Sequence, residues 1–147
     1  MNDIKIDKIS QNDALGVAEI EKECFSVPFT EQNILDYIKN PIWHFLVARS
    51  GDGVLGYISF TIIIDECQIV NVAVTKEARK LGIGSLLLNE FFGYIKENGA
   101  RSVYLEVRES NTPAIKLYEK FDFKVTGVSK NHYSKPTENA LLMSRML

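Results

Sequence analysis

The chain has 147 residues, a length that suits one compact domain with a single hydrophobic core, so we expect residues 1–147 to form one domain. Its formal net charge is -2, and no stretch combines clustered lysine and arginine with interleaved aromatic residues, which argues against nucleic acid or an anionic membrane as a partner. The N-terminus lacks the features of a signal peptide and no apolar segment has membrane-spanning length, so we expect a soluble cytoplasmic protein.

The two cysteines are expected to be reduced core residues. Cys24 and Cys67 show neither a metal-ligand spacing nor a C-x-x-C pattern, and each lies in an apolar neighbourhood where a small buried thiol is common. The sequence therefore predicts neither a disulfide nor a metal site.

The first part of the chain is predicted to contain one strand and two helices. Residues 4–9, in which isoleucines are separated by polar residues, predict the strand, and Asn12 or Asp13 then caps a helix. The apolar positions of this helix recur at helical spacing and are Leu15, Ala18, Ile20 and Cys24. The pattern then breaks, and Thr30 begins a second helix that ends at residues 40–41, Asn-Pro.

The rest of the chain alternates β-branched runs with two amphipathic helices. Strands are predicted at residues 43–49, 54–64, 67–75, 102–107, 123–129 and 139–146, the first three being antiparallel neighbours because their turns are short. Helices are predicted at residues 82–98 and 111–121. The first of these has its apolar positions at Ile83, Leu86, Leu87, Phe91, Tyr94 and Ile95. The resulting order predicts a mixed sheet with helices packed against it.

Residues 78–85, ARKLGIGS, stand where a predicted strand gives way to a predicted helix. Backbone N–H groups at a helix start lack intrahelical acceptors, and glycines let an anion approach them closely, while Arg79 and Lys80 add mobile positive charge. The Walker pattern is absent, and Leu87 stands where the dinucleotide pattern needs its third glycine, which disfavours nucleotide hydrolysis and hydride transfer. The two glycines alone fit a tight strand-to-helix turn equally well.

The segment of residues 72–84 resembles the acetyl-CoA motif of the GNAT superfamily of N-acetyltransferases, whose core is Gln or Arg, x, x, Gly, x, Gly or Ala. The resemblance implies an α/β (α+β) fold, with a mixed, mostly antiparallel twisted sheet of about seven strands and about four helices, and acetyl-CoA as cosubstrate. It also implies that a strand binds the pantetheine arm and that the glycine turn wraps the pyrophosphate. The implied contacts are Val72, Ala73, Val74, Arg79, Lys80, Leu81, Gly82, Ile83, Gly84 and Ser85.

Residues 105–121, LEVRESNTPAIKLYEKF, form a second motif on a strand and the helix that follows. Strand alternation sets Glu106 on the face opposite its apolar neighbours, and Tyr118 falls two turns along the helix. The pattern L-E-V-R-x-S-N-x-x-A-I-x-L-Y resembles the branch of ribosomal-protein-alanine N-acetyltransferases (RimI), which modify protein N-terminal amines. The resemblance implies Glu106 as general base, Tyr118 as general acid toward the departing thiol and Asn111 as a coenzyme A contact.

The same branch implies how the acceptor is held. Residues 23–30, ECFSVPFT, resemble its substrate-side loop, with Phe29 at a position that is usually aromatic, and Tyr133 is placed to line an acceptor peptide groove. The implied substrate is the N-terminal alanine of ribosomal protein S18. The family pattern G-x-R-x-x-Y-Y is altered here, because Ser129 replaces an arginine and His132 a tyrosine, which leaves the peptide preference open.

Proton chemistry constrains these roles independently of the resemblance. At pH 7 an α-amine costs about 1 kcal/mol to deprotonate and a lysine about 4.6 kcal/mol, so a terminal amine makes the weaker demand on a base. A glutamate serves as that base when it is buried or when it acts through ordered water, and the sequence leaves both open. Proton transfer from a tyrosine to a thiolate is uphill by about 2 kcal/mol, so hydrogen bonding to the developing thiolate is the preferred role for Tyr118.

Each of these residues also has an ordinary structural interpretation. Glu106 alone fits a solvated strand residue and Tyr118 alone fits an aromatic at the edge of the core, but their joint occurrence with Asn111 and the glycine turn favours a functional site. The leading hypothesis is a monomeric enzyme that acetylates a protein N-terminus. The alternatives are acetylation of a lysine side chain or small-molecule amine, and a catalytically inactive acyl-CoA-binding regulatory module.

Overall fold

The computed structural model describes residues 3–51 and 53–147. Two positions of the N-terminal stretch, Met1 and Asn2, and one position of the turn after residue 50, Asp52, lie outside the described residues. The order of strands and helices is the predicted one. The elements are β1 (Lys5–Lys8), α1 (Ala14–Cys24), α2 (Glu31–Ile38), β2 (Trp43–Ser50), β3 (Gly53–Ile63), β4 (Glu66–Val74), α3 (Ile83–Glu97), β5 (Ser102–Arg108), α4 (Thr112–Lys120), β6 (Lys124–Tyr133) and β7 (Glu138–Met146). Short 3-10 turns, Gln11–Asp13 and Lys76–Ala78, precede α1 and α3.

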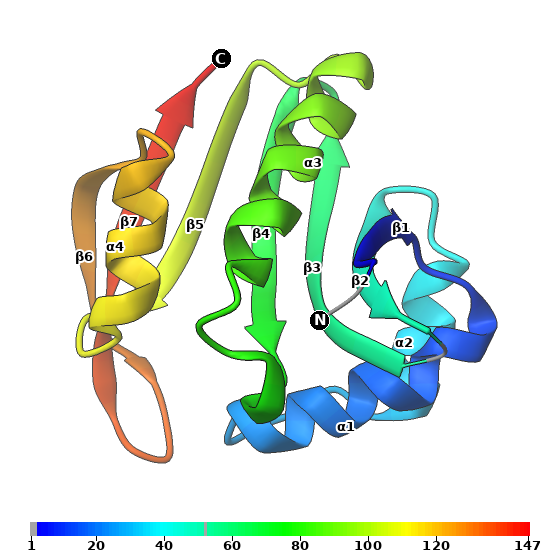
Figure 1. The fold of residues 1–147 in the computed structure, drawn as a ribbon. Coiled ribbons are helices and arrows are strands. Elements are labelled where there is room, and N and C mark those ends of the chain that lie inside the picture. The colour runs from blue at the N-terminus through cyan, green and yellow to red at the C-terminus, as the bar shows by residue number, and fades with distance from the viewer. Residues whose placement is uncertain (1–2, 52) are drawn as a thin grey trace.

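One seven-stranded sheet, in the order β1-β2-β3-β4-β5-β7-β6, organises the fold (Figure 1). Neighbouring strands pair antiparallel except β4 and β5, which are parallel, so the sheet is mixed and mostly antiparallel as predicted. The ladder between β4 and β5 joins only residues 66–68 to residues 102–104. Beyond these residues the two strands diverge, and the sheet splits into a part formed by β1 to β4 and a part formed by β5, β7 and β6 (Figure 1).

A bulge in β4 lies where this divergence begins. Ser59 of β3 pairs with Asn71 and Phe60 pairs with Ile69, so Val70 is an extra residue on the β4 side of the ladder. A bulge bends its strand and increases the local twist. The bend accounts for the separation of the C-terminal half of β4 from β5.

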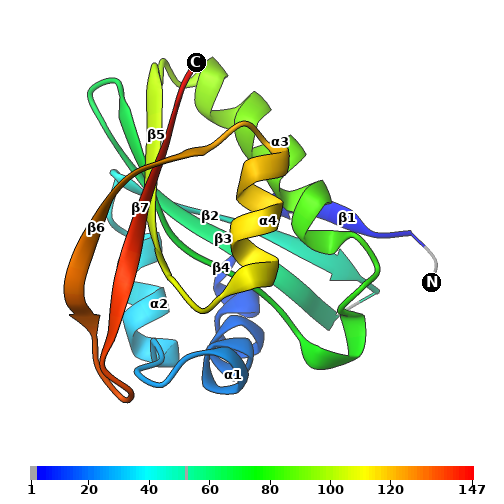
Figure 2. The same cartoon turned by 90° about the vertical axis from the view of Figure 1, so that its left-hand side faces the viewer.

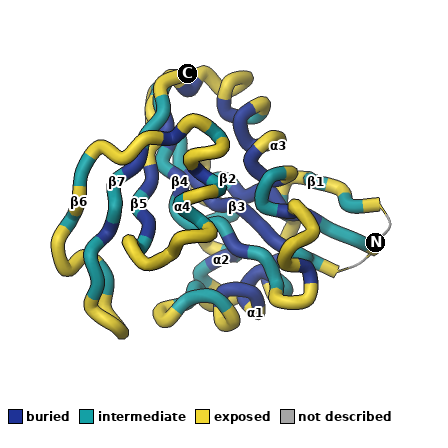
Figure 3. Tube along the Cα trace, turned by 60° about the vertical axis from the view of Figure 1, so that its left-hand side comes forward, coloured by how far each residue is buried: buried dark blue, intermediate teal, exposed yellow. Residues whose placement is uncertain are grey.

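Helices cover both faces of the sheet, with α3 and α4 on one face and α1 and α2 on the other (Figure 2). Strand alternation assigns β3 side chains to the two sides: Ile58 and Phe60 pack in the cluster with α3, and Tyr57 packs in the cluster with α1. The buried segments run along the central strands and the inner faces of the helices (Figure 3). Within the described part of the chain, none of the helices combines the length and apolar character needed to cross a bilayer.

The helical periodicity located α1 and α3 correctly but misplaced part of their buried faces. Leu15 and Leu86 belong to the predicted apolar positions of these helices, but they are 54% and 41% exposed. The buried apolar positions that the periodicity missed are Ala14 and Val17 in α1 and Leu88 and Phe92 in α3. Where two adjacent stripes of a helix are both apolar, contact with the sheet decides which stripe is buried. That contact joins residues far apart in the chain, so it cannot be predicted from the periodicity of the helix alone.

The predicted helix starts are confirmed in part. Thr30 and Asn111 cap α2 and α4, each side-chain oxygen accepting a hydrogen bond from the backbone N–H three residues later, at 3.1 and 3.2 Å. Asp13 holds the N-cap position of α1, but its side chain makes no cap there. Its carboxylate instead accepts hydrogen bonds from the Ser10 backbone N–H at 2.8 Å and from the Arg49 guanidinium at 2.5 and 2.9 Å, which ties α1 to β2.

We predict that Phe60→Ala lowers the free energy of unfolding by about 3–5 kcal/mol, because it leaves a cavity in the centre of the core. Phe60 is fully buried, and its ring meets Phe91 edge to face with 4.8 Å between ring centroids. The matched control is Val27→Ala, a position that is 67% exposed, which should stay within about 0.5 kcal/mol of the wild type. Urea unfolding of the three proteins measures both effects, and equal losses in the two variants would contradict this description of the core.

Candidate active site

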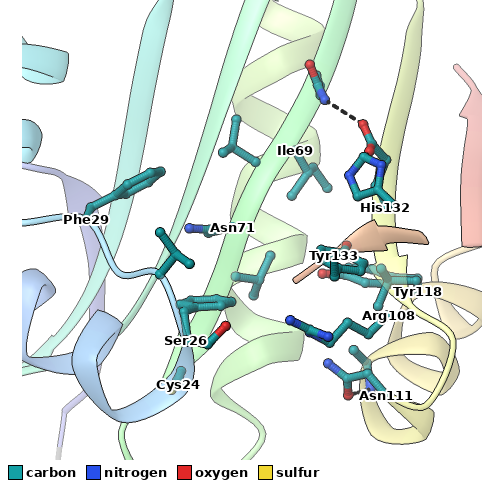
Figure 4. Close-up of a pocket in the computed structure, with 18 of the residues that line it drawn as sticks. Cys24, Ser26, Phe29, Ile69, Asn71, Arg108, Asn111, Tyr118, His132 and Tyr133 are labelled. Carbon is teal, nitrogen blue, oxygen red and sulfur yellow. Dashed lines mark hydrogen bonds and ion pairs between the residues drawn. The ribbon is translucent and has the colours of Figure 1, made fainter. Parts of the chain in front are cut away.

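A cleft with a volume of about 510 Å³ opens where β4 and β5 separate. Five segments line it: the loop after α1, the middle of β4, the end of β5, the first two turns of α4 and the end of β6. The lining residues are Cys24, Phe25, Ser26, Val27, Phe29, Gln68, Ile69, Val70, Asn71, Val72, Glu106, Val107, Arg108, Asn111, Ala114, Tyr118, His132, Tyr133 and Ser134. In Figure 4, Ser26 and Phe29 approach from one wall, and Arg108, Tyr118 and His132 from the other.

The divergent strands give this cleft a wall of backbone polar groups. Among the described residues, β4 continues from Ile69 to Val74, and β5 from Leu105 to Arg108, without a ladder between them. Strand edges of this kind offer N–H and C=O groups to an extended ligand that contains amides. The opening therefore suits a chain-like ligand that lies between the two strands.

Glu106 stands in the cleft as strand alternation predicted, because the flanking residues Leu105 and Val107 are buried on the opposite face. Its side chain is 27% exposed. Gln68 Nε2 donates to Glu106 Oε1 over 3.4 Å, and Glu106 Oε2 lies 2.5 Å from Nε2 of His132. The contact between His132 and Glu106 was not predictable from local patterns, because the two residues lie on β6 and β5, which α4 separates in the chain and β7 separates in the sheet.

Tyr118 and Asn111 bring the start of α4 to the same cleft. Tyr118 is only 7% exposed, and its ring packs edge to face on Phe123 with 5.7 Å between centroids. Burial raises the pKa of the Tyr118 hydroxyl well above its ordinary value, so the group stays protonated and can act as a hydrogen-bond donor. Asn111 uses Oδ1 to cap α4, and its Nδ2 is a donor that a ligand can use.

The glycine turn lies beyond the C-terminal end of β4 and outside the cleft lining. Gly82 adopts φ +78°, a left-handed conformation that favours glycine, and it precedes α3 without a side-chain cap on that helix. A Cβ on Gly84 would lie 3.0 Å from Leu117 Cδ2, so this glycine permits close packing of α3 on α4. Each of the two glycines therefore has a structural role. The turn also leaves the N–H groups in the first turn of α3 without a side-chain cap.

Two side chains of this turn, those of Arg79 and Ile83, are less available to a ligand than the sequence suggested. The Arg79 guanidinium, predicted as a mobile charge, donates to the Val74 carbonyl over 3.3 Å and lies 3.4 Å from the Cys24 sulfur. Ile83 is buried in the core, so it can offer a ligand only its backbone. Of the predicted contacts in this region, Val72 alone lines the cleft, whereas the others follow it along β4, the turn and the start of α3.

The predicted acceptor residues also lie in the cleft. Phe29 packs edge to face on Tyr37 at 5.1 Å and on Trp43 at 6.2 Å, which fixes one wall. Tyr133 lies under the Arg108 guanidinium, 4.5 Å from its ring centroid, on the other wall. Of the two cysteines, Cys67 is fully buried as expected, whereas Cys24 is half-buried and reaches the cleft lining.

Glu21 is a buried group that the sequence analysis missed. It lies on the inner face of α1, where its carboxylate accepts hydrogen bonds from the Phe29 N–H at 2.7 Å, from Asn71 Nδ2 at 2.9 Å and from the Tyr57 hydroxyl. Burial raises the pKa of Glu21 to about 7, although these hydrogen bonds favour the charged form. Its position, four residues after the buried Val17, is the helical spacing that could have indicated it.

Comparison with known proteins places the chain in a family. Residues 14–123 match the acetyltransferase (GNAT) family. A Bacillus subtilis (strain 168) protein, named as a candidate ribosomal protein bS18-alanine N-acetyltransferase, is 38% identical over 128 residues, which are 86% of this chain and 85% of that protein. The ribosomal protein bS18-alanine N-acetyltransferase of Haemophilus influenzae is 30% identical over 142 residues, 95% of this chain and 96% of that protein.

A solved structure has the same fold as this chain. The crystal structure of the ribosomal-protein-S18-alanine N-acetyltransferase from Escherichia coli superposes with a TM-score of 0.89 at 23% identity, over 98% of this chain and 94% of that one. Together with the family match, this likeness confirms the predicted fold. The chain belongs to the acetyltransferase (GNAT) family.

The raised pKa of Glu21 predicts a pH dependence of stability. The carboxyl group titrates near 4.5 in the unfolded chain and near 7 in the folded protein, so its favourable contribution is fully present below pH 4.5 and is lost as the pH rises through about 7. Between pH 5 and pH 8 the free energy of unfolding should therefore fall by about 2–3 kcal/mol more in the wild type than in Glu21→Gln. Urea unfolding at the two pH values measures this difference, and equal changes in both proteins would contradict it.

Proposed function

We propose that the chain is an acetyl-CoA-dependent N-acetyltransferase that acetylates the α-amine at the N-terminus of a protein. The observation that carries the proposal is the convergence of Glu106 and Tyr118 on one cleft, at the point where β4 and β5 separate. A base and a hydroxyl donor are the groups that acyl transfer from a thioester to an amine requires. Family membership and the names of the similar proteins support the same reaction class.

The donor fits the backbone of this structure. Coenzyme A carries an amide-containing arm, which suits the unpaired edge of β4 at Val72, Ala73 and Val74, and a pyrophosphate, which suits the uncapped start of α3. We assign the pyrophosphate to the backbone of residues 79–85, with Lys80 as the exposed cation beside it. Asn111 would contact the arm through Nδ2. When bound, acetyl-CoA supplies an activated acyl group, and no metal is required for this chemistry.

Each residue has a defined task in the transfer. Glu106 takes one proton from the acceptor ammonium, and the freed nitrogen lone pair forms the new bond to the acetyl carbonyl carbon. As the carbon–sulfur bond breaks, the nitrogen loses its second proton, which is taken up by the departing sulfur, so that the products are the amide and the coenzyme A thiol. Tyr118 donates a hydrogen bond to the sulfur as negative charge develops there. Because burial holds its pKa well above the ordinary value, the Tyr118 hydroxyl stabilises the thiolate as a donor and keeps its proton.

An α-amine is the acceptor that this site can activate most readily, because a lysine costs about 3.5 kcal/mol more to deprotonate at pH 7. Phe29 and Tyr133 would hold the first residues of the peptide between the two walls. The names of the similar proteins support the N-terminal alanine of ribosomal protein S18 as the substrate, which would place the reaction in the cytoplasm. All the assigned residues come from one chain, so a monomer suffices.

We predict that Glu106→Gln and Tyr118→Phe each lower kcat by about 10²- to 10⁴-fold while the KM for acetyl-CoA changes by less than about threefold, because both residues act on charge that develops during transfer. Release of the coenzyme A thiol with alanine-initiated peptides gives the rate. Matched controls are Glu109→Gln, an exposed glutamate after β5, and Tyr94→Phe, a tyrosine on α3 outside the cleft.

Two outcomes would count against this assignment. Unchanged kcat values in Glu106→Gln and Tyr118→Phe would remove their roles and leave the fold assignment intact. Tight acetyl-CoA binding by the wild type, without thiol release above background for any N-terminal peptide, would refute the enzyme and support the acyl-CoA-binding regulatory module instead.

A further inference from the structure

Glu21 holds both ends of the loop that forms one wall of the cleft. Its backbone carbonyl accepts the Phe25 N–H over 2.9 Å, and its side-chain Oε1 accepts the Phe29 N–H over 2.7 Å. Ser26, between these two bonds, lines the cleft, and Phe29 lies on the same wall (Figure 4). One residue of α1 therefore fixes where this wall begins and where it ends.

The second carboxylate oxygen of Glu21 links the loop to the central strands. Glu21 Oε2 accepts hydrogen bonds from Asn71 Nδ2 at 2.9 Å and from the Tyr57 hydroxyl. Because an ionised carboxylate accepts and cannot donate, Asn71 must turn Nδ2 toward Glu21 and keep Oδ1 as an acceptor. Asn71 lines the cleft, so the same carboxylate fixes the loop and the amide orientation of a cleft residue.

The arrangement requires a carboxylate. Glu21 is fully buried, and three donors converge on it, which its two oxygens can accept because they offer about four lone-pair sites. A glutamine has one acceptor oxygen, so it can keep the Phe29 bond but must turn an N–H group toward Asn71 or Tyr57. A leucine accepts no hydrogen bond and leaves all three donors without their partner.

We propose that Glu21 is a positioning residue for the acceptor peptide, because it fixes the wall of residues 25–29 against which the first residues of the peptide bind. This inference rests on the proposed function, in which Phe29 contacts the acceptor. Glu21 is fully buried and acts through the loop, without touching the substrate. Its loss should therefore weaken peptide binding while the acetyl-CoA contacts and the reacting groups Glu106 and Tyr118 stay in place.

The test measures the KM for an alanine-initiated peptide and the KM for acetyl-CoA in the wild type, Glu21→Leu and Glu21→Gln. It is run at pH 8.5, above the pKa of about 7 of the Glu21 carboxyl group. We expect the peptide KM to rise about tenfold in Glu21→Leu and about threefold in Glu21→Gln, which keeps one acceptor oxygen. The KM for acetyl-CoA, and kcat at saturating peptide, should change by less than about twofold.

The matched control is Glu19→Gln, which removes the same charge from an exposed position of the same helix and should leave all three constants unchanged. An unchanged peptide KM in Glu21→Leu would overturn the inference. An equal rise in both KM values would also overturn it, because a merely structural role loosens the donor and acceptor sides alike. If Glu21→Leu does not fold, an unchanged peptide KM in Glu21→Gln overturns the inference in its place.

The fluorescence of Trp43 separates this inference from the proposed function. Trp43 is the single tryptophan of the chain, and its ring packs edge to face on Phe29 with 6.2 Å between ring centroids. Without substrates, Glu21→Leu should displace Phe29 and raise acrylamide quenching of this fluorescence, whereas Glu19→Gln should not. Unchanged quenching in Glu21→Leu overturns the inference whatever the activity. Raised quenching in a protein that acetylates no peptide supports the fixed wall and refutes the proposed function.

Discussion

Parallel pairing between β4 and β5 stops after Gln68 and Tyr104, and the candidate site depends on that stop. A continuous ladder would use the backbone groups of both strands and would close the space in which Glu106 stands. The bulge at Val70 supplies the bend in β4, and β5 remains anchored by its full antiparallel ladder with β7. The sheet therefore opens along the β4–β5 junction, while its two parts stay fixed by helices on both faces.

The two walls of the cleft are held by different means. The wall formed by β5, α4 and β6 is fixed by the burial of Tyr118, by the Asn111 cap and by the contact between Glu106 and His132. The opposite wall is a loop, and a loop with few regular hydrogen bonds needs another anchor. Glu21 is that anchor, because it accepts the Phe29 N–H while also holding Asn71 of β4.

This anchor carries an energetic cost. Burial without a cationic partner disfavours the Glu21 carboxylate, and its pKa rises to about 7 for that reason. The three hydrogen bonds offset part of the cost and give the loop after α1 a single position. The protein therefore loses some stability toward neutral pH in order to define the wall that faces the acceptor.

Much of the fold follows from local patterns in the sequence. Strand alternation placed Glu106 on the cleft face, and the caps at Thr30 and Asn111 located two helix starts, because these signals act within a few residues. Contacts across the sheet were not predictable in the same way. The Glu106–His132 pair and the Glu21–Asn71 pair each join residues far apart in the chain, and no local spacing encodes them. The role of Gly84 in packing α3 on α4 depends on Leu117 and was hidden for the same reason.

The choice of acceptor nitrogen is the central chemical claim. A peptide that begins with alanine and contains one internal lysine, incubated with the protein and acetyl-CoA, can be read by fragment mass spectrometry. The proposed site predicts the acetyl group on the N-terminal α-amine, with the lysine unmodified and with product formation slowed by about 10²- to 10⁴-fold when Glu106 is replaced by glutamine. An acetyl group on the lysine, or equal modification of both amines, would contradict it.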